Sequence, residues 1–532
     1  MSGYTGTGVL VRLALRRDRV RLLIWVLSLG VMMVYATQAL AALYPTAADR
    51  QVRALLISSP AAVMMSGPGY GVDDYTLGAM IANEFALTLV IASSIMSIFL
   101  VVRHTRAEEE SGRSELVRAG VTGLHAQLTA ALVVAVVANL AVAAVQLAAM
   151  LAAGLALVDS VALALAMASV SLVFAALTTV CVQVAASARA ATGAALALLA
   201  AAFVVRALGD TLERGGSALS WFSPIAWMHQ MRPFVDLRWW PVLLTPALIV
   251  TAVAAAYLLL PRRDVAAGFL QPRPGRRQAS AGLAGPLGLA WRLQRGTVLA
   301  WAVALGLMFA ASGSLLQTVA DSMLEMPPAV VRVLAIDADD IVDGFSSVMA
   351  TMAALAVGAY AVASVLRLRG EEQAGRTSQA LAAAVGRGRW LAAGVGLTVA
   401  TSTGLLAVAG LALGSTAAAA TGDRAWVLRL TAACLVYAPS VWLLAALTAA
   451  LYGWHAPAAG AAWLLVVYAV VVGLFGSLLD LPGWALDLSP VHLTPRLPAE
   501  EVAAAPLLLL GLLALLLWIV GAVAFRRRDL TA

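Results

Sequence analysis

Long apolar runs recur along the whole of this 532-residue chain, and charged or proline-containing breaks separate them. A run of about 20 apolar residues is long enough to cross the hydrocarbon core of a bilayer as a helix. Only 12% of the residues are charged and 62% are hydrophobic, a surplus that no soluble core could bury. We therefore predict an all-α polytopic membrane protein with about twelve transmembrane helices. The predicted spans lie near 22–43, 80–102, 124–153, 160–187, 190–208, 241–260, 297–319, 344–366, 390–418, 427–452, 457–479 and 504–525.

The first half of the chain is repeated in the second half. Four short stretches match in the same order, which indicates a tandem duplication. The matches are Leu13-Ala14-Leu15-Arg16 with Leu289-Ala290-Trp291-Arg292, Arg106 to Arg113 with Arg369 to Arg376, Ser223-Pro224 with Ser489-Pro490, and Arg262-Arg263-Asp264 with Arg527-Arg528-Asp529. We expect two six-helix halves, 1–261 and 291–532, joined by a cytoplasmic linker at 262–290. Six spans per half would make the halves parallel, with a pseudo-twofold axis along the membrane normal.

Arginine residues gather on one predicted side of the membrane. That side receives the N-terminal arginines, the stretches 103–122 and 367–389, the linker, and the arginines after the last span. Short loops rich in arginine usually stay in the cytoplasm. We therefore expect a multi-pass protein of a bacterial plasma membrane with both termini in the cytoplasm. This uneven distribution accounts for the net charge of +7 without any binding of nucleic acid.

The chain contains no lysine, which rules out two kinds of chemistry. A P-loop needs a lysine on the nucleotide phosphates, and Schiff-base catalysis needs a lysine amine. The five histidines are scattered without the spacing of metal ligands, and Cys181 and Cys434 lie inside apolar runs. We therefore expect that this chain binds no nucleotide, cofactor or metal ion and is not an enzyme by itself.

Two charged segments, each just after the second apolar run of its half, carry the sharpest signal. The first charged segment contains Arg106, Glu108, Glu109, Glu110, Gly112 and Arg113, and the second contains Arg369, Glu371, Glu372, Gly375 and Arg376. Glu109 and Arg113 are four residues apart, as are Glu372 and Arg376, so each pair is expected to bridge one helical turn. One such helix alone would indicate a solvated helix on the membrane surface. Two copies at the same topological position favour surfaces for a twofold-symmetric partner in the cytoplasm.

The two charged segments resemble the coupling helices of ABC-2 type exporter permeases. The arginine-rich N-terminus and twelve fused spans are similar to the actinobacterial form of this family, the tetronasin-type and polyketide antibiotic exporters and multidrug-efflux permeases. The resemblance implies a pathway between the halves that exports amphipathic compounds such as antibiotics. It also implies a homodimer of a separate ATPase subunit, which would hold the ATP and Mg. The second segment departs from the first at Gln373 and Ser378, so we expect two unequal docking sites.

Polar and aromatic residues near the outer ends of the spans are candidates for the transport pathway. The candidates are Asn83, Glu84 and Phe85 in the second span, Arg206 in the fifth, and Trp221, Phe222 and Trp227 before the sixth. The aromatic residues would fit an interfacial belt equally well. Three polar residues inside spans are expected to make interhelical hydrogen bonds instead, namely Asn139, Gln146 and Gln183.

Two other functions stay open at this point. A proton-coupled secondary drug transporter also often has twelve spans in two halves, although few carboxylates suited to a proton relay lie inside the spans here. A membrane glycosyltransferase is less favoured, and it would use Asp73 and Asp74 in the first outer loop.

Overall fold

The fold was analysed in a computed structural model that describes residues 2–57, 60–213, 215–264, 267–270, 277–278, 283, 285–314, 316, 338–383, 385–475 and 482–529. Across these residues it contains twelve helices long and apolar enough to cross a membrane, and no strand longer than the single bridge between Ala185 and Leu270. The prediction of an all-α membrane protein with about twelve spans is confirmed. The distal ends of two predicted spans, 297–319 and 457–479, lie partly outside the described residues.

The chain divides into two compact units, unit 1 from Met1 to Gly275 and unit 2 from Arg276 to Ala532. The division falls within the predicted linker, whose residues are described only in part. The predicted duplication and its axis stay predictions, and each unit is therefore considered by itself below.

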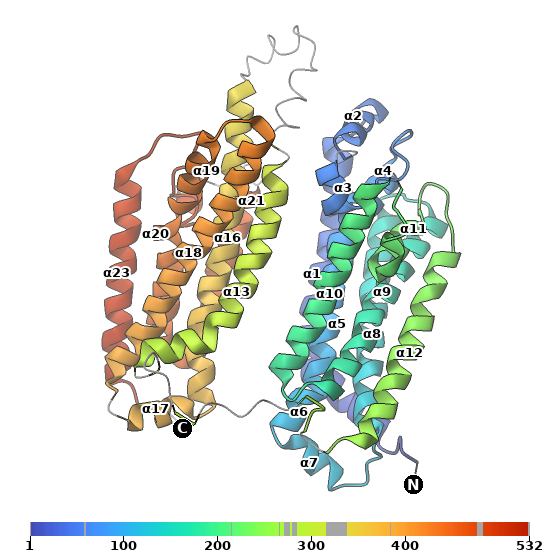
Figure 1. The fold of residues 1–532 in the computed structure, drawn as a ribbon, viewed down its shortest axis with the longest axis horizontal. Helices are drawn as coiled ribbons and strands as arrows, with labels where there is room; N and C mark the ends of the chain where they lie inside the picture. The colour runs from blue at the N-terminus through green and yellow to red at the C-terminus, as the bar shows by residue number, and fades with distance from the viewer. Residues whose placement is uncertain are drawn as a thin grey trace. The chain divides into compact units, whose positions relative to one another are not determined.

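Unit 1 is a bundle of six long helices (Figure 1). They are α1 (Thr7–Leu43), α5 (Ala86–His104), α8 (Ala126–Ala152), α9 (Leu157–Val184), α10 (Ala188–Leu212) and α12 (Leu244–Leu259). The helix α5 is extended by α4 (Leu77–Met80) and by a π-helical turn, η1 (Ile81–Phe85). The spans that contain α5 and α9 are the most buried in unit 1, whereas those of α1 and α12 are mostly exposed.

The helix α1 is longer than the apolar run that predicts it. It has 37 residues and begins at Thr7, so it includes all the N-terminal arginines before Leu22. Arginine has a high helix propensity, and the helix therefore continues beyond the segment that is apolar enough to lie in lipid.

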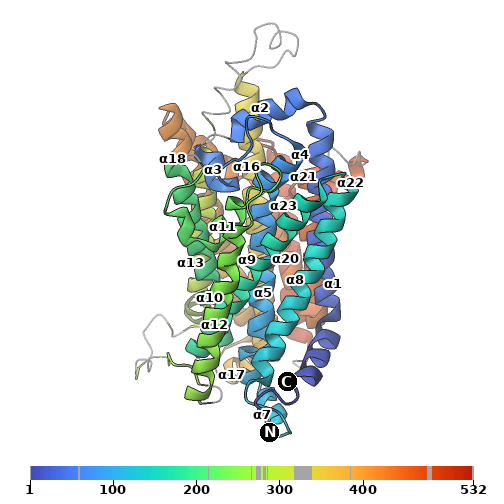
Figure 2. The same ribbon diagram turned by 90° about the vertical axis from the view of Figure 1, so that its right-hand side faces the viewer.

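The two ends of unit 1 differ in their short elements (Figure 2). One end, here called the basic end, carries the N-terminus, α6 (Arg106–Glu110), α7 (Arg113–Arg118) and η4 (Leu260–Arg262). Backbone hydrogen bonds from Gly123 to Thr5 and from His125 to Gly3 hold the N-terminus there. The opposite end carries α2 (Ala47–Ile57), α3 (Pro60–Ser66), η2 (Ser220–Phe222), α11 (Pro224–Gln230) and η3 (Trp240–Leu243).

Unit 2 is also a bundle of long helices (Figure 1). They are α13 (Pro286–Gly313), α16 (Ala338–Gln373), α18 (Arg387–Thr421), α19 (Ala425–Leu435) followed by α20 (Ala438–Trp454), α21 (Ala462–Phe475) and α23 (Ala504–Arg527). Shorter elements are α17 (Arg376–Ala382), η6 (Ala456–Ala461) and α22 (Gly483–Asp487). The break between α19 and α20 precedes Pro439, which lacks the amide hydrogen that an unbroken helix would use.

A close crossing of α20 and α23 positions the end of unit 2 that carries the second charged segment. A Cβ atom on Gly453 would collide with the carbonyl oxygen of Gly521, so the two backbones touch only because both residues are glycine. Small residues allow this approach between helices in a membrane. The crossing brings the residues that follow α23 against the end of α20.

Candidate functional site

The first charged segment is a short helix, a tight turn and a second short helix. The helix α5 ends at Thr105, whose φ of −121° and ψ of −89° interrupt it, and α6 follows. Gly112 then takes a left-handed conformation, with φ at 73°, and begins α7. A Cβ atom on Gly112 would meet nothing within 4 Å, so the backbone conformation, rather than space, favours glycine here.

The second charged segment repeats this turn but not the interruption. Gly375 has φ at 70° and begins α17, and the space around its Cα is also open. The helix α16, in contrast, runs without a break from the membrane span to Gln373. The second segment is therefore a direct extension of its span, whereas the first is separated from its span at Thr105.

The ion pairs inside the two segments match each other, but they are not the predicted ones. Arg113 lies 3.6 Å from Glu108, and Arg376 lies 2.5 Å from Glu371, which raises the pKa of Arg376 through the hydrogen bond that Glu371 accepts. The predicted pairs Glu109–Arg113 and Glu372–Arg376 are therefore wrong. The left-handed glycine lies between the members of each predicted pair, so the spacing of a continuous helix does not apply.

Glu109 and Glu372 instead pair with arginines that follow the last span of their own unit. The carboxylate of Glu109 accepts hydrogen bonds of 2.5 and 2.9 Å from Arg263, and that of Glu372 accepts bonds of 2.6 and 2.7 Å from Arg528. The Arg263 and Glu109 side chains are 5% and 4% exposed, and those of Arg528 and Glu372 are 14% and 7% exposed. We name these two ion pairs the Glu–Arg clamps.

Each clamp also includes the end of the fourth span of its unit. Arg263 donates a hydrogen bond of 2.6 Å to the side chain of Gln183, in the last turn of α9. Arg528 donates one of 2.8 Å to the carbonyl of Tyr452, in the last turn of α20, and the hydroxyl of Tyr452 donates one of 2.7 Å to Glu372. The two clamps thus join the same three elements, the charged segment, the fourth span and the chain after the sixth span.

The first segment has further contacts that have no counterpart among the described residues of the second. The buried Arg106 side chain lies 2.7 Å from Glu109 and donates to the carbonyl of Ala267, so Glu109 lies between two arginines. Glu110 accepts a hydrogen bond of 2.6 Å from the amide of Ala188, at the positive N-terminus of α10. The corresponding residue in the second segment, Gln373, is uncharged, and Arg369 contacts the carbonyl of Pro457 at 3.4 Å.

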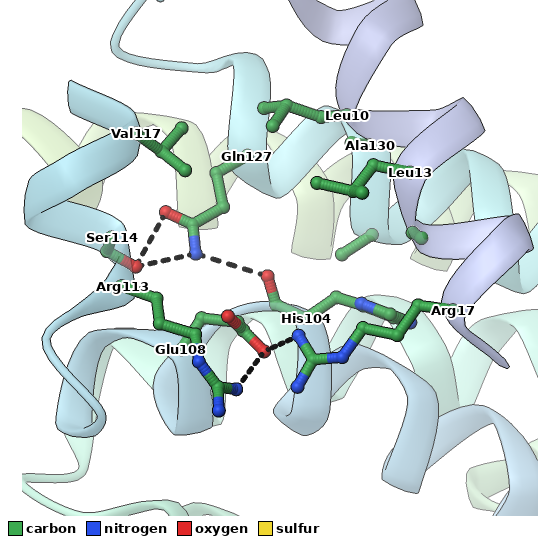
Figure 3. A pocket seen from close by; sticks show the side chains of 12 residues that line it. Leu10, Leu13, Arg17, His104, Glu108, Arg113, Ser114, Val117, Gln127 and Ala130 are labelled. Carbon is green, nitrogen blue, oxygen red and sulfur yellow. Dashed lines mark hydrogen bonds and ion pairs between the residues drawn. The ribbon is translucent and has the colours of Figure 1, made fainter. Parts of the chain in front are cut away.

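A small cavity joins the first segment to α1 and α8 (Figure 3). Figure 3 shows Arg17 of α1 and Arg113 of α7 directed toward Glu108, while Gln127 of α8 bridges Ser114 and the carbonyl of His104. The cavity has a volume of about 70 Å³, enough for about two water molecules rather than a drug. We interpret it as a small polar space between helices, here called the polar seam.

A buried carboxylate ties α1 to α5 next to this seam. The Asp18 side chain is 1% exposed and lies 2.9 Å from both Arg103 and His104. The matched position in the second half is the neutral Gln294, which accepts a hydrogen bond of 2.7 Å from Ser364. The two units therefore differ in charge at this position.

The predicted pathway residues of the second span lie at the opposite end of unit 1 and have partners within it. Asn83, Glu84 and Phe85 form most of the π-helical turn η1, a rare structure that is often associated with functional sites. Glu84 accepts bonds of 2.7 and 3.1 Å from Arg53. Asn83 exchanges two hydrogen bonds with the backbone of Tyr70. These side chains hold the outer loop, and their role in a pathway stays a prediction.

The other predicted pathway residues lie near the same end. The fully buried Arg206 donates to the carbonyls of Val63 and Met64 and lies 3.5 Å from Asp210. Trp227 donates to the carbonyl of Trp221, which stacks on Trp240, while Phe222 is 81% exposed. Arg206, Trp221 and Trp227 thus have partners within unit 1, and transport through this region stays a prediction.

The sequence assigns no site role to the clamp arginines or to Tyr452, and it predicts for Gln183 only a hydrogen bond between helices. The signal was present, because Arg262-Arg263-Asp264 and Arg527-Arg528-Asp529 are one of the four duplicated matches. By their position after the last span of each half, these arginines predict only the cytoplasmic side of the membrane. Within the described part of the chain, no group of three histidine, cysteine or acidic residues could hold a metal ion. The expectation that this chain binds no cofactor stays a prediction.

Comparison with known proteins places the chain in a family. The family model described as the C-terminal domain of the multidrug efflux system permease Rv1217c matches residues 10–260 and 283–526. The multidrug efflux system permease protein Rv1217c of Mycobacterium tuberculosis (strain ATCC 25618 / H37Rv) is 37% identical over 536 residues, which cover 99% of this chain and 96% of that protein. With nearly its whole length matched, the chain belongs to the family of multidrug efflux system permeases represented by Rv1217c.

Proposed function

We propose that this chain is the membrane permease of an ABC exporter, which moves amphipathic compounds such as antibiotics and other drugs out of a bacterial cell. ATP, with its Mg, would be bound and hydrolysed by a homodimer of a separate ATPase subunit. The observation that carries this proposal is the pair of charged segments with the same left-handed glycine, the same internal ion pair and the same clamp. Two surfaces built alike suit a partner that has two identical grooves.

In this proposal the basic end of unit 1 and the end of unit 2 that carries the second charged segment lie in the cytoplasm of a bacterial plasma membrane, with both termini on that side. Closure of the ATPase dimer on ATP would displace the charged segments, and the spans attached to them would reorganise the pathway. ATP bound to the ATPase subunits then shifts the permease between two conformational states. The printed name of the relative, a multidrug efflux system permease, supports drugs as the transported class.

One observation favours the alternative of proton-coupled transport. Asp18 and His104 form a buried pair of titratable groups, and such groups can serve a proton relay. Nothing comparable favours a glycosyltransferase, because Asp73 and Asp74 are exposed in an outer loop.

Purification from the native membrane tests the proposal directly. The tagged permease should recover an ATPase chain in a ratio of one to two, and vesicles containing both should hydrolyse ATP faster with rhodamine 6G, ethidium or a macrolide. Charge reversal at both exposed arginines, Arg113→Glu with Arg376→Glu, should reduce ATPase recovery. The exposed pair Arg262→Gln with Arg527→Gln is the matched control. Efflux that follows a proton gradient without any ATPase would contradict the proposal.

A further inference from the structure

The Glu–Arg clamps recur at matched positions in the two units although their members are far apart in the sequence. Glu109 and Arg263 are 154 residues apart, and Glu372 and Arg528 are 156 apart. We propose that Arg263 and Arg528 are positioning residues that make each charged segment move as one body with the ends of the fourth and sixth spans of its unit. This inference rests on the proposed function.

The chemistry of the clamps suits a permanent link. Both carboxylates are nearly buried, and the Nη1 and Nη2 atoms of Arg263 reach the two oxygens of Glu109 separately. A planar guanidinium holds a carboxylate in a fixed orientation, which a lysine ammonium does not. Separation of a buried pair would leave two desolvated charges. The clamp is therefore expected to stay closed while the permease changes state.

The backbone explains why a link is needed. The first charged segment follows the interruption at Thr105 and contains the left-handed Gly112. A displacement of this segment is therefore not transmitted rigidly to α5 through the backbone. The second is continuous with α16, so an unbroken helix joins it to that span alone. In both units the clamp adds the ends of the fourth and sixth spans, since Gln183 and Tyr452 bind the same arginines.

Neighbouring arginines provide matched controls. Arg262 and Arg527 directly precede the clamp arginines, are exposed, and make no ion pair with any described residue. Arg263→Gln leaves Glu109 paired with Arg106, so this variant should fold. Arg528→Gln would leave Glu372 without a described cationic partner, and it is therefore combined with Glu372→Gln.

The first experiment measures a distance in the reconstituted complex of permease and ATPase. Spin labels are placed on Leu116→Cys and Leu258→Cys, two exposed positions on α7 and α12, after Cys181→Ala and Cys434→Ala remove the native thiols. The label-to-label distance should be the same in the nucleotide-free state and with ATP and vanadate. Arg263→Gln should broaden it, whereas Arg262→Gln should not. A wild-type distance that changes with nucleotide, or an unchanged Arg263→Gln distribution, would overturn the proposal.

The second experiment measures drug-stimulated ATP hydrolysis in the same vesicles, with the probes named above. Arg263→Gln should retain the ATPase and its basal rate but lose stimulation by drug by about tenfold, within the usual range of coupling between sites. The Glu372→Gln/Arg528→Gln pair alters the second charged segment itself, and its stimulation relative to its own basal rate should fall by a similar factor. Arg263→Lys should retain only part of the stimulation of ATP hydrolysis by drug. If drugs stimulate ATP hydrolysis by the clamp variants as much as by the wild type, the inference about the clamps is refuted and the proposed function is not. Absence of an ATPase from the wild-type complex would refute the proposed function.

Discussion

A left-handed glycine decides where the helix of each charged segment breaks. Replacement of Gly375 by alanine puts a Cβ atom into open space but leaves a residue strained at a φ of 70°. That conformation disfavours an L-residue by about 1–2 kcal/mol, so the unfolding temperature of the purified protein should fall. The control is Gly370→Ala, also in open space but inside α16, where alanine should stabilise by up to about 1 kcal/mol. Shifts of the same sign in both variants would contradict this account.

His229 gives the opposite end of unit 1 a dependence on pH. It is buried in α11, and neither ring nitrogen has a hydrogen-bond partner among the described residues. Burial, and secondarily the charge of Arg206, lowers the pKa of His229 from 6.5 to about 3. Below pH 6.5 the unfolded chain binds a proton that the folded chain does not, so the free energy of unfolding should decrease as the pH falls toward 3.

The slope contributed by this histidine is at most about 1.4 kcal/mol per pH unit, and above pH 6.5 it is absent. His229→Gln cannot titrate, so its thermal stability should fall less steeply with acid than that of the wild type. His455→Gln, at an exposed position, is expected to retain the wild-type slope. If His229→Gln has that slope as well, His229 is not the group responsible.

At the scale of elements, the crossing of α20 and α23 supports the second clamp. Gly453→Ala would force the two backbones apart, and overpacking of this kind destabilises by about 1–3 kcal/mol. It would also move Arg528 away from Glu372 and Tyr452, so both thermal stability and drug-stimulated hydrolysis should decrease. Gly511→Ala lies on the same helix with nothing near its Cα and should change neither. If Gly453→Ala changes neither thermal stability nor drug-stimulated hydrolysis, the close crossing is not needed to hold the second clamp.

The sequence predicts these elements unevenly, for physical reasons. Apolar run length predicts the spans because lipid requires about 20 residues, but it does not show where α1 continues into the arginines or where a π-helical turn interrupts a span. The charged segments were identified by their duplication. Local spacing predicts the wrong ion pairs within them, because it assumes a continuous helix, whereas the clamp partner lies in another element.

For the whole molecule, the two units should respond unequally to loss of their clamps. Glu109 retains Arg106 when Arg263 is replaced by glutamine, whereas among the described residues Glu372 retains only the hydroxyl of Tyr452 when Arg528 is replaced. An uncompensated buried charge destabilises by about 3–5 kcal/mol, so Arg528→Gln alone should lower the unfolding temperature more than Arg263→Gln. Arg527→Gln and Arg262→Gln should change it little. Equal decreases of the unfolding temperature in the two clamp variants would show that Arg106 does not compensate for the loss of Arg263.

The long sequence separation within each clamp also has a consequence for the order of events during synthesis. Glu109 and Glu372 leave the ribosome about 150 residues before the arginines that neutralise them. Until its sixth span is inserted, each unit therefore contains a carboxylate without its final counter-ion. A ribosome that stops before Arg528 would release a chain whose first unit has both members of its clamp and whose second unit has Glu372 without Arg528.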